Sequence, residues 1–298
     1  MRRGNAPKTI FAAMFNSRTI SATLYCTLVC ALFFSCTARK GLPQNGWKTL
    51  FNGKDLSDWT IKIKDHPLNE NYAQTFRVAD GMMQVRYDGN DDFKRQYGHI
   101  YFKQPYSAYL LEVEYRFVGE QAKGGEGWAT RNSGAMLHCQ PPNTLALDQD
   151  FPISLEMQFL GGDGKNNRTT ANLCTPGTNV FVNNKLFLPH CINSTSKTYH
   201  GEQWVKAQAL VLADSLVQHI VNGDTVFTFT RPQYDGRDPW VKKAGYADGA
   251  PIKGGYISLQ SESHPVDFRN VRIFDLAPYM NNKARLSEVL QQLRMRTN

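Results

Sequence analysis

The 298-residue chain is 41% hydrophobic and 20% charged, an ordinary globular composition that argues against a long disordered protein. Its net charge of +8 is concentrated at the two ends, because residues 1–35 contribute +4 and residues 281–298 contribute +3. The body is left with +1, which argues against a phosphate-tracking surface, so we expect no nucleic-acid partner.

The amino terminus has the pattern of an export signal. Basic residues precede a short apolar run, 20–34, that ends at Ser35-Cys36. A small residue before a cysteine resembles a lipoprotein processing site, so residues 1–36 are interpreted as a signal peptide with lipid attached to Cys36. Met14 is an alternative start. A signal peptide without lipid and a membrane span are the other interpretations of the run, and its short length disfavours the span.

The expected location follows from this signal. The chain would be exported to the periplasm of a Gram-negative bacterium or held at its outer membrane by the lipid. Residues 37–45 would form a short linker, and the lack of an acidic residue in 37–40 favours the periplasmic side. The lipid would make the membrane a partner, whereas no obligate protein partner is inferred.

Residues 46–276 are expected to form one all-β domain. Alternating apolar and polar residues, or successive short apolar runs between turn residues, predict strands at 109–118, 153–159, 206–212, 216–221, 225–229, 255–260 and 268–274. The dipeptide Asn222-Gly223 favours the positive φ angles of a type I′ turn between two of them. Many short strands without a helical period indicate a β-sandwich or barrel. Only the tail, 277–298, has apolar residues at helical spacing.

The cysteines divide between leader and body. Cys139, Cys174 and Cys191 would remain in an oxidising compartment after Cys36 takes lipid. Three cysteines cannot all pair with one another. Cys174 and Cys191 share one loop-rich stretch, so we predict a disulfide between them that closes a long loop. No Cys-x-x-Cys spacing indicates a zinc site.

Three strands carry short acids, amides and imidazoles on one face, and no lysine. These faces comprise Ser154, Glu156 and Gln158; Gly134, Met136, His138 and Gln140; and Tyr256, Ser258, Gln260 and Glu262. If the strands are neighbours, they form a sugar-facing surface with general acid–base capacity, and Trp128 and Tyr256 could stack on sugar rings. The alternative is an ordinary solvated sheet face. His264 follows a strand end, where surface histidines are common.

Several motifs, in order along 46–276, resemble the 3-keto-disaccharide hydrolase family. They are the opening Gly46–Trp59, Asn132-Ser133-Gly134, Glu156-Met157-Gln158, Val221-Asn222-Gly223, Gly255–Gln260 and Phe268–Val271. The resemblance implies a concanavalin-like jelly-roll fold of two antiparallel sheets. Three positions depart from the pattern of many members: Gly161 replaces Asp, His138 replaces Arg, and Ser261–Pro265 replaces an Asp-His-Gly segment.

The resemblance implies cleavage of a carbohydrate substrate, a glycoside oxidised at carbon 3. A ketone there acidifies the proton on carbon 2, and its removal expels the substituent on carbon 1. Glu156 is cast as the base and Glu262 or His264 as the acid. The residues expected to bind the sugar are Asn132, Ser133, His138, Gln140, Gln158, Trp128 and Tyr256. A divalent metal ion held by Glu156 and His138 is a further hypothesis, which their spacing does not establish.

Two other functions compete with this enzyme. A carbohydrate-binding β-sandwich without chemistry predicts a shallow aromatic platform and no convergent acids. A structural surface protein predicts Lys and Thr in place of the cleft. The enzyme predicts that Glu156 and Glu262 converge in a concave cleft, with at least one raised pKa.

Overall fold

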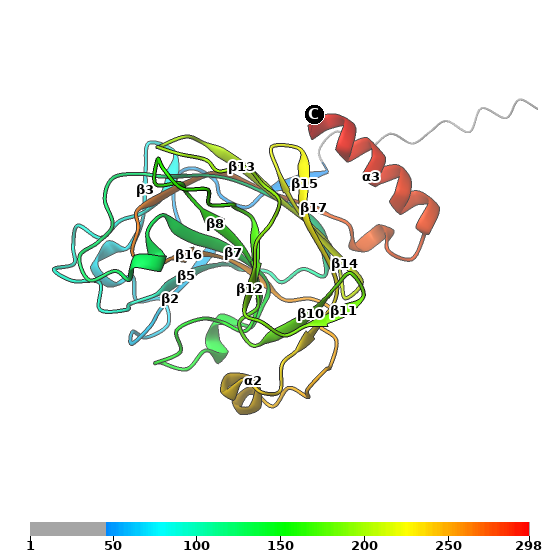
Figure 1. The fold of residues 1–298 in the computed structure, drawn as a ribbon, viewed down its shortest axis with the longest axis horizontal. Helices are drawn as coiled ribbons and strands as arrows, with labels where there is room; N and C mark the ends of the chain where they lie inside the picture. Colours follow the sequence, from blue (N-terminus) through cyan, green and yellow to red (C-terminus); the bar gives the residue numbers. More distant parts are fainter. Residues whose placement is uncertain (1–45, 298) are drawn as a thin grey trace, which may run out of the picture. The chain divides into compact units, whose positions relative to one another are not determined.

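Two antiparallel sheets form a β-sandwich in the computed structural model, which describes residues 46–297 (Figure 1). The predicted all-β, concanavalin-like jelly roll with a C-terminal helix is confirmed. The export signal, Cys36 and the linker to residue 45 lie outside the described residues.

The larger sheet, here sheet A, has the order β11-β10-β15-β14-β13-β6-β17-β4-β3, with β1 paired to β17. Its strands are β1 (Trp47–Thr49), β3 (Phe76–Ala79), β4 (Met82–Val85), β6 (Ala108–Phe117), β10 (Thr178–Val182), β11 (Lys185–Phe187), β13 (Val205–Leu212), β14 (Leu216–Val221), β15 (Asp224–Tyr234) and β17 (Val266–Asp275). Asn222 and Gly223 both have positive φ, as a type I′ turn requires, so the predicted hairpin is confirmed.

The second sheet, sheet B, has the order β12-β9-β8-β7-β16-β5-β2 and carries the candidate site. Its strands are β2 (Trp59–Ile63), β5 (Gly98–Phe102), β7 (Asn132–Cys139), β8 (Leu155–Leu160), β9 (Asn172–Cys174), β12 (Cys191–Ile192) and β16 (Tyr256–Ser261). The three strands with polar faces, β7, β8 and β16, are neighbours, as the sequence interpretation required.

Helices are few and short. They are the 3₁₀ turns η1 (Tyr72–Gln74), η2 (Gly127–Ala129), η3 (Pro142–Thr144) and η4 (Ala277–Tyr279), and the α-helices α2 (Pro239–Ala244) and α3 (Lys283–Thr297). The sequence interpretation missed α2, although Asp238 caps its first turn and Gly245 ends it in the left-handed region. No helix between residues 46 and 297 has the length and apolar character needed to span a bilayer.

The main core lies between the sheets. Strand β8 shows how alternation builds it: Leu155, Met157 and Phe159 are fully buried in this core, while Glu156 and Gln158 point to the other face. A smaller hydrophobic cluster on the outer face of sheet A includes Val289 and Leu293 of α3. The apolar residues predicted at helical spacing in the tail are thus the ones that pack this helix on the sheet.

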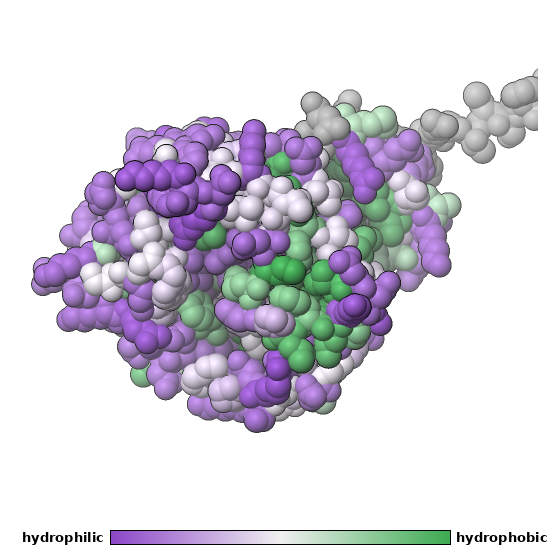
Figure 2. Space-filling model, in the orientation of Figure 1, coloured by the Kyte–Doolittle hydropathy of each residue, from purple (hydrophilic) through white to green (hydrophobic). Residues whose placement is uncertain are grey.

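One face of the molecule carries hydrophobic surface. Figure 2 shows it over the region of β10, β11 and β12, where Leu186 and Leu188 are exposed. Most of the remaining surface in this view is polar.

Candidate functional site

The outer face of sheet B gathers polar side chains that are buried beneath loops. Pairing places Glu156 between Met136 of β7 and Cys174 of β9, and Gln158 next along β8 between Gly134 and Asn172. On the other side of β7, strand β16 carries Gln260, ends at Ser261 and is followed directly by Glu262. The sandwich therefore brings together two acids and several amides that are separated by up to 130 residues in the chain.

Gly134 makes room for the first acid. A Cβ atom at this position would lie 2.6 Å from Oε1 of Glu156, which is closer than such atoms approach in real structures. The missing side chain on β7 thus lets the Glu156 carboxyl lie against the strand. The glycine of the Asn-Ser-Gly motif is therefore explained by the space that the Glu156 carboxyl occupies.

Glu156 and Glu262 line one cavity of about 250 Å³, here called the acid cavity. Its other lining residues are Trp128, Asn132, Phe151, Gln158, Cys174, Pro176, His190 and Cys191. The volume is just below the roughly 300–1,000 Å³ of pockets for drug-sized ligands, so it suits a ligand about the size of one sugar ring.

Burial makes both acids hold their protons unusually tightly. Glu156 and Glu262 are only 7% and 3% exposed. Desolvation raises the pKa of Glu156 to about 8. Desolvation also raises the pKa of Glu262 well above its ordinary value, and the neighbouring charge of Glu156 adds to that increase. At neutral pH the pair therefore retains at least one proton, and the predicted raised pKa is present.

Arg168 is the cation whose charge acts on Glu262, and the sequence interpretation missed this residue. Its guanidinium donates hydrogen bonds to the backbone oxygens of Trp128 (3.0 Å) and Gly161 (3.1 Å), and to that of Thr130. Its charge lowers the pKa of Glu262, against the larger effect of burial. Because its partners are backbone carbonyls, no side-chain pattern in the sequence identifies it.

Several buried polar atoms near the two acids have no hydrogen-bond partner among the described residues. They are Oδ1 of Asn132, Oε1 of Gln260, Oε2 of Glu262 and Nε2 of His99. His99 lies directly opposite Gln260 on β5. Unpaired polar atoms cost free energy when buried, so their concentration here indicates a place where a polar ligand binds.

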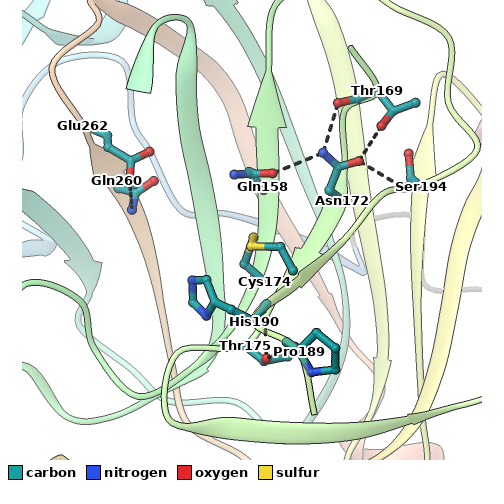
Figure 3. The surroundings of a disulfide bond; sticks show 11 residues. Gln158, Thr169, Asn172, Cys174, Thr175, Pro189, His190, Ser194, Gln260 and Glu262 are labelled. Atoms are coloured by element: carbon teal, nitrogen blue, oxygen red, sulfur yellow. Dashed lines mark hydrogen bonds between the residues drawn. A yellow bond between two sulfur atoms is a disulfide. The ribbon is translucent and has the colours of Figure 1, made fainter. Parts of the chain in front are cut away.

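The carboxamide of Gln158 has a fixed orientation. Nδ2 of Asn172 donates to its Oε1 at 3.1 Å, which leaves its Nε2 on the opposite side. Figure 3 shows that nitrogen directed towards Gln260 and Glu262. Asn172 is itself held through its Oδ1, which accepts from Oγ1 of Thr169 at 2.8 Å and from the backbone N–H of Ser194 at 2.9 Å.

Trp128 lies at the mouth of the acid cavity, with 52% of its surface exposed. It stacks on Tyr97 at a ring-centroid distance of 6.2 Å, and the hydroxyl of Tyr97 donates to Glu126 at 2.7 Å. An exposed, supported indole beside buried acids is suited to stack on the apolar face of a sugar.

The predicted disulfide between Cys174 and Cys191 is present and forms part of the cavity wall (Figure 3). These cysteines and His190 are also the one group of three close ligand residues within the described part of the chain. Both sulfurs are bonded to each other in the disulfide, so neither is a thiolate that could ligate a metal. The group therefore does not fit a metal site.

His138 does not join Glu156, which corrects the sequence interpretation. It has a positive φ of 48°, and the pairing of β7 with β16 shifts register beside it. Its ring packs against Tyr109, and its Nε2 is 3.3 Å from the carbonyl oxygen of Ala213. This β-bulge interrupts the alternation from which a shared face with Gly134 was inferred.

The metal hypothesis fails on the same geometry. His138 lines a separate cavity of about 520 Å³ and Glu156 lines the acid cavity, so the two residues do not hold one ion. We call the separate cavity the tyrosine pocket. Tyr106, Tyr234, Tyr246 and Tyr256 line it.

Gln140 and Tyr256 also belong to the tyrosine pocket rather than the acid cavity. Gln140 additionally fixes the loop that follows β7, because its Oε1 accepts from Nε2 of Gln149 and from the backbone N–H of Ile153, each at 2.9 Å. Ser133 lies on the opposite side of β7 from Gly134, and its hydroxyl donates to the carbonyl oxygen of Gln260 at 2.8 Å. Its contribution is to strand pairing rather than to contact with a ligand.

His264 is buried beside the acid cavity but does not line it. It packs edge-on against Phe117, with ring centroids 5.7 Å apart. Burial, and then the charges of Arg131 and Arg168, lower its pKa to about 4. The imidazole is therefore uncharged at neutral pH, which makes it a poor proton donor.

Fold and site together define a jelly-roll domain of the carbohydrate-acting class. The family described as the 3-keto-alpha-glucoside-1,2-lyase-like domain matches residues 46–274, and the chain belongs to it. The resemblance drawn from the motifs is thereby confirmed. No curated protein matches the chain.

Solved structures with a similar chain path are distant in sequence. A candidate glycosyl hydrolase from Parabacteroides distasonis ATCC 8503 is 16% identical, with a TM-score of 0.46 over 77% of this chain and 99% of that chain. A galectin-like protein of unknown function from Bacillus subtilis is 10% identical, with a TM-score of 0.47 over 77% and 94%. A β-glucanase from Bacillus licheniformis is 12% identical, with a TM-score of 0.41 over 77% and 96%.

Proposed function

We propose that this protein cleaves glycosides whose sugar carries a ketone at carbon 3, with Glu156 as general base and Glu262 as general acid. The observation that carries the proposal is the pair of buried acids in one cavity, both with raised pKa. A general base is most effective when its pKa lies near the working pH, and about 8 for Glu156 meets that condition.

The proposed reaction begins at carbon 2. The Glu156 carboxylate takes the carbon-2 proton, and the electron pair forms an enolate with the 3-keto oxygen. The enolate then expels the substituent on carbon 1, whose oxygen takes the proton of Glu262. The product is an unsaturated ketone, Glu156 is protonated and Glu262 is ionised.

Water completes a net hydrolysis by the reverse order of proton transfers. Glu262 removes a proton from water as its oxygen adds to carbon 1, and Glu156 returns a proton to carbon 2. Both acids regain their initial protonation states. A lyase would release the unsaturated ketone before this second stage.

The enolate oxygen needs a hydrogen-bond donor. Nε2 of Gln158 is available for this, because Asn172 occupies the other end of its carboxamide. A donor fixed before the reaction stabilises developing charge without reorganising, which makes it effective in a buried cavity. Trp128 would stack on the sugar ring.

Glu262 suits the acid role better than His264. It lines the acid cavity, and burial together with the charge of Glu156 raises its pKa, which favours the protonated form that an acid needs. His264 lies outside the lining and is uncharged at that pH. The convergent acids also favour an enzyme over the binding-module hypothesis, which predicted none.

The test is incubation of the purified protein with a 3-keto-glucoside, measuring release of the aglycone. Wild type should release it, and Glu156→Gln and Glu262→Gln should lower kcat by about 10²–10⁴-fold. Glu120→Gln, at an exposed glutamate, is the matched control and should behave as wild type. Binding of the glucoside without release by wild type would replace this proposal with the binding module.

We also propose that the chain is exported and anchored by lipid on Cys36. The disulfide supports an oxidising compartment, because such bonds are rare in the cytosol. Cells grown with radioactive palmitate should label the wild-type chain and the Cys139→Ser variant, but not Cys36→Ser. Equal labelling of all three, or of none, would contradict the anchor.

A further inference from the structure

The tyrosine pocket is separated from the acid cavity along the same sheet. Tyr256 lines the first and Glu262 the second, and six positions of extended chain separate them, about 20 Å. The loop after β7 lies between the two cavities: Gln140, at its start, lines the tyrosine pocket, and Phe151, near its end, lines the acid cavity. The two cavities are therefore distinct sites.

Four half-buried tyrosines give this pocket its character. Tyr234 and Tyr246 stack in parallel, with centroids 4.0 Å apart and planes within 3°. Tyr106 packs against the core through Tyr109 at 6.1 Å. Rings held rigidly and left partly open offer flat apolar surfaces, and each hydroxyl adds a polar edge.

The pocket selects for an uncharged ligand. None of the described residues that line it is an acid, a lysine or an arginine. Its one imidazole is uncharged at neutral pH, because burial lowers the pKa of His138 to about 4. The neighbouring cavity beside α2 differs, since it is lined by Asp150, Asp235 and Arg237.

His138 leaves one hydrogen-bond acceptor unused. The residue is 4% exposed, and its Nδ1 has no partner within the described chain. Its Nε2 faces the carbonyl oxygen of Ala213, which can only accept, so the ring proton belongs on Nε2. Nδ1 is then a buried lone pair without a hydrogen-bond donor among the described residues, in a side chain that adjoins the pocket.

The β-bulge at His138 builds this corner of the pocket. A Cβ atom at Gly255 would lie 2.5 Å from the carbonyl carbon of His138, so only glycine permits the close approach of β16. The positive φ of His138 belongs to the same distortion. Bulges occur beside binding sites, where they redirect a side chain.

We propose that the tyrosine pocket is a second saccharide-binding site, which takes one neutral sugar ring against its tyrosine faces and beside the imidazole of His138. A sugar ring has the required properties: apolar C–H faces, several hydroxyl donors and no charge. The site binds without catalysis, and its occupancy does not depend on the proposed reaction.

The experiment is an NMR titration of the full chain carrying Glu156→Gln, with cellobiose as the probe. In this background, Tyr246→Ala and His138→Ala should each weaken binding about five- to tenfold. Glu120→Gln, at an exposed residue that lines neither cavity, is the matched control and should leave this binding unchanged. Thermal unfolding of each variant verifies that it is folded.

A readout without pocket mutations protects the test against misfolding. In the Glu156→Gln background with a ¹⁵N-labelled imidazole, cellobiose should shift the Nδ1 resonance of His138, and glucuronate at the same concentration should not. The proposal is overturned if cellobiose leaves that resonance unmoved, if Trp128→Ala alone abolishes binding, or if phenol binds more tightly than the sugar. Loss of cleavage activity in the wild type would leave this result unaffected.

Discussion

Gly134 is the residue on which the position of Glu156 depends most directly. The Gly134→Ala substitution would place a methyl group 2.6 Å from Oε1 of that carboxyl. We expect the carboxyl to move by a few tenths of an ångström or more, and kcat to fall by about 10–100-fold, since small misplacements of catalytic groups are costly. Gly127→Ala is the control, because no atom lies within 4 Å of its Cβ position. Unchanged kcat in Gly134→Ala would contradict this account.

The buried Glu156 carboxyl should also appear in the stability of the protein. Its pKa is about 8 in the folded chain and 4.5 ordinarily, so folding takes up a proton between these values. The contribution of this carboxyl to the free energy of unfolding is therefore fully present below pH 4.5 and is lost as pH rises towards 8. Relative to wild type, Glu156→Gln should gain on the order of 2–4 kcal/mol of unfolding free energy from pH 5 to pH 8.

Urea unfolding at several pH values measures this difference. Comparing the two proteins cancels the contributions of the buried histidines, whose lowered pKa values act in the opposite direction. Glu120→Gln should show a difference from wild type that does not vary with pH. A pH-independent difference for Glu156→Gln would mean that its carboxyl is not desolvated.

Asn172 should act through Gln158 without touching substrate. The Asn172→Asp substitution keeps the acceptor for Thr169 and Ser194 but removes the donor to Gln158. The freed carboxamide can then turn its Nε2 away from the acid cavity. We expect kcat to fall by about tenfold or more while KM changes little. A purely structural role would instead lower thermal stability and leave kcat intact in the folded protein.

At the scale of elements, β7 shows why the sequence located the site only in part. Alternation correctly placed Gly134 beside Glu156 and Gln158, because this part of the strand is regular. It failed at His138, where a bulge reverses the side chain. A bulge depends on the neighbouring strand, here on Gly255 of the approach to β16, so a pattern within one strand cannot reveal it.

The helix α2 was missed for a different reason. Its six residues are too few to show an apolar period, which was the signal used to find helices. Its ends were nevertheless encoded, by Asp238-Pro239 at the start and Gly245 at the close. Capping residues would have located this helix. The guanidinium of Arg168, by contrast, donates only to backbone carbonyls, so no residue pattern in the sequence marks it.

The disulfide belongs to the element scale, since it joins β9 to β12 across a sequence separation of 17. Closing a loop of about that length stabilises a fold by roughly 3 kcal/mol. The double variant Cys174→Ala/Cys191→Ala should therefore unfold at a clearly lower temperature in a thermal scan. Cys139→Ser, at the free buried cysteine, is the control and should not lower the unfolding temperature by the same amount. Equal stability of the double variant and wild type would show that the bond does not constrain this loop.

At the scale of the whole molecule, sheet A and sheet B have different tasks. Sheet A carries ion pairs along its outer face, such as Arg269 with Glu114 at 2.7 Å. Sheet B carries the buried acids and the acid cavity on its outer face, whereas the tyrosine pocket is lined from both sheets, by Tyr256 of β16 and Tyr234 of β15. Alternation and turn residues indicated a β-sandwich or barrel, and the resemblance to the family added the concanavalin-like jelly roll. The position of the candidate site depends in addition on the order of the strands. Glu156 and Glu262 come together only because β8 and β16 lie on either side of β7.

The central claim is that Glu156 exchanges a proton with carbon 2 of a 3-keto sugar. Its most direct test compares the cleavage rate of a 3-keto-glucoside with that of the same compound deuterated at carbon 2, with a blank without protein. We predict that deuterium at carbon 2 slows cleavage by wild type, because the bond to that atom breaks in the reaction, and that Glu156→Gln strongly lowers the rate for both compounds. Equal rates of wild type on the two compounds would contradict the account.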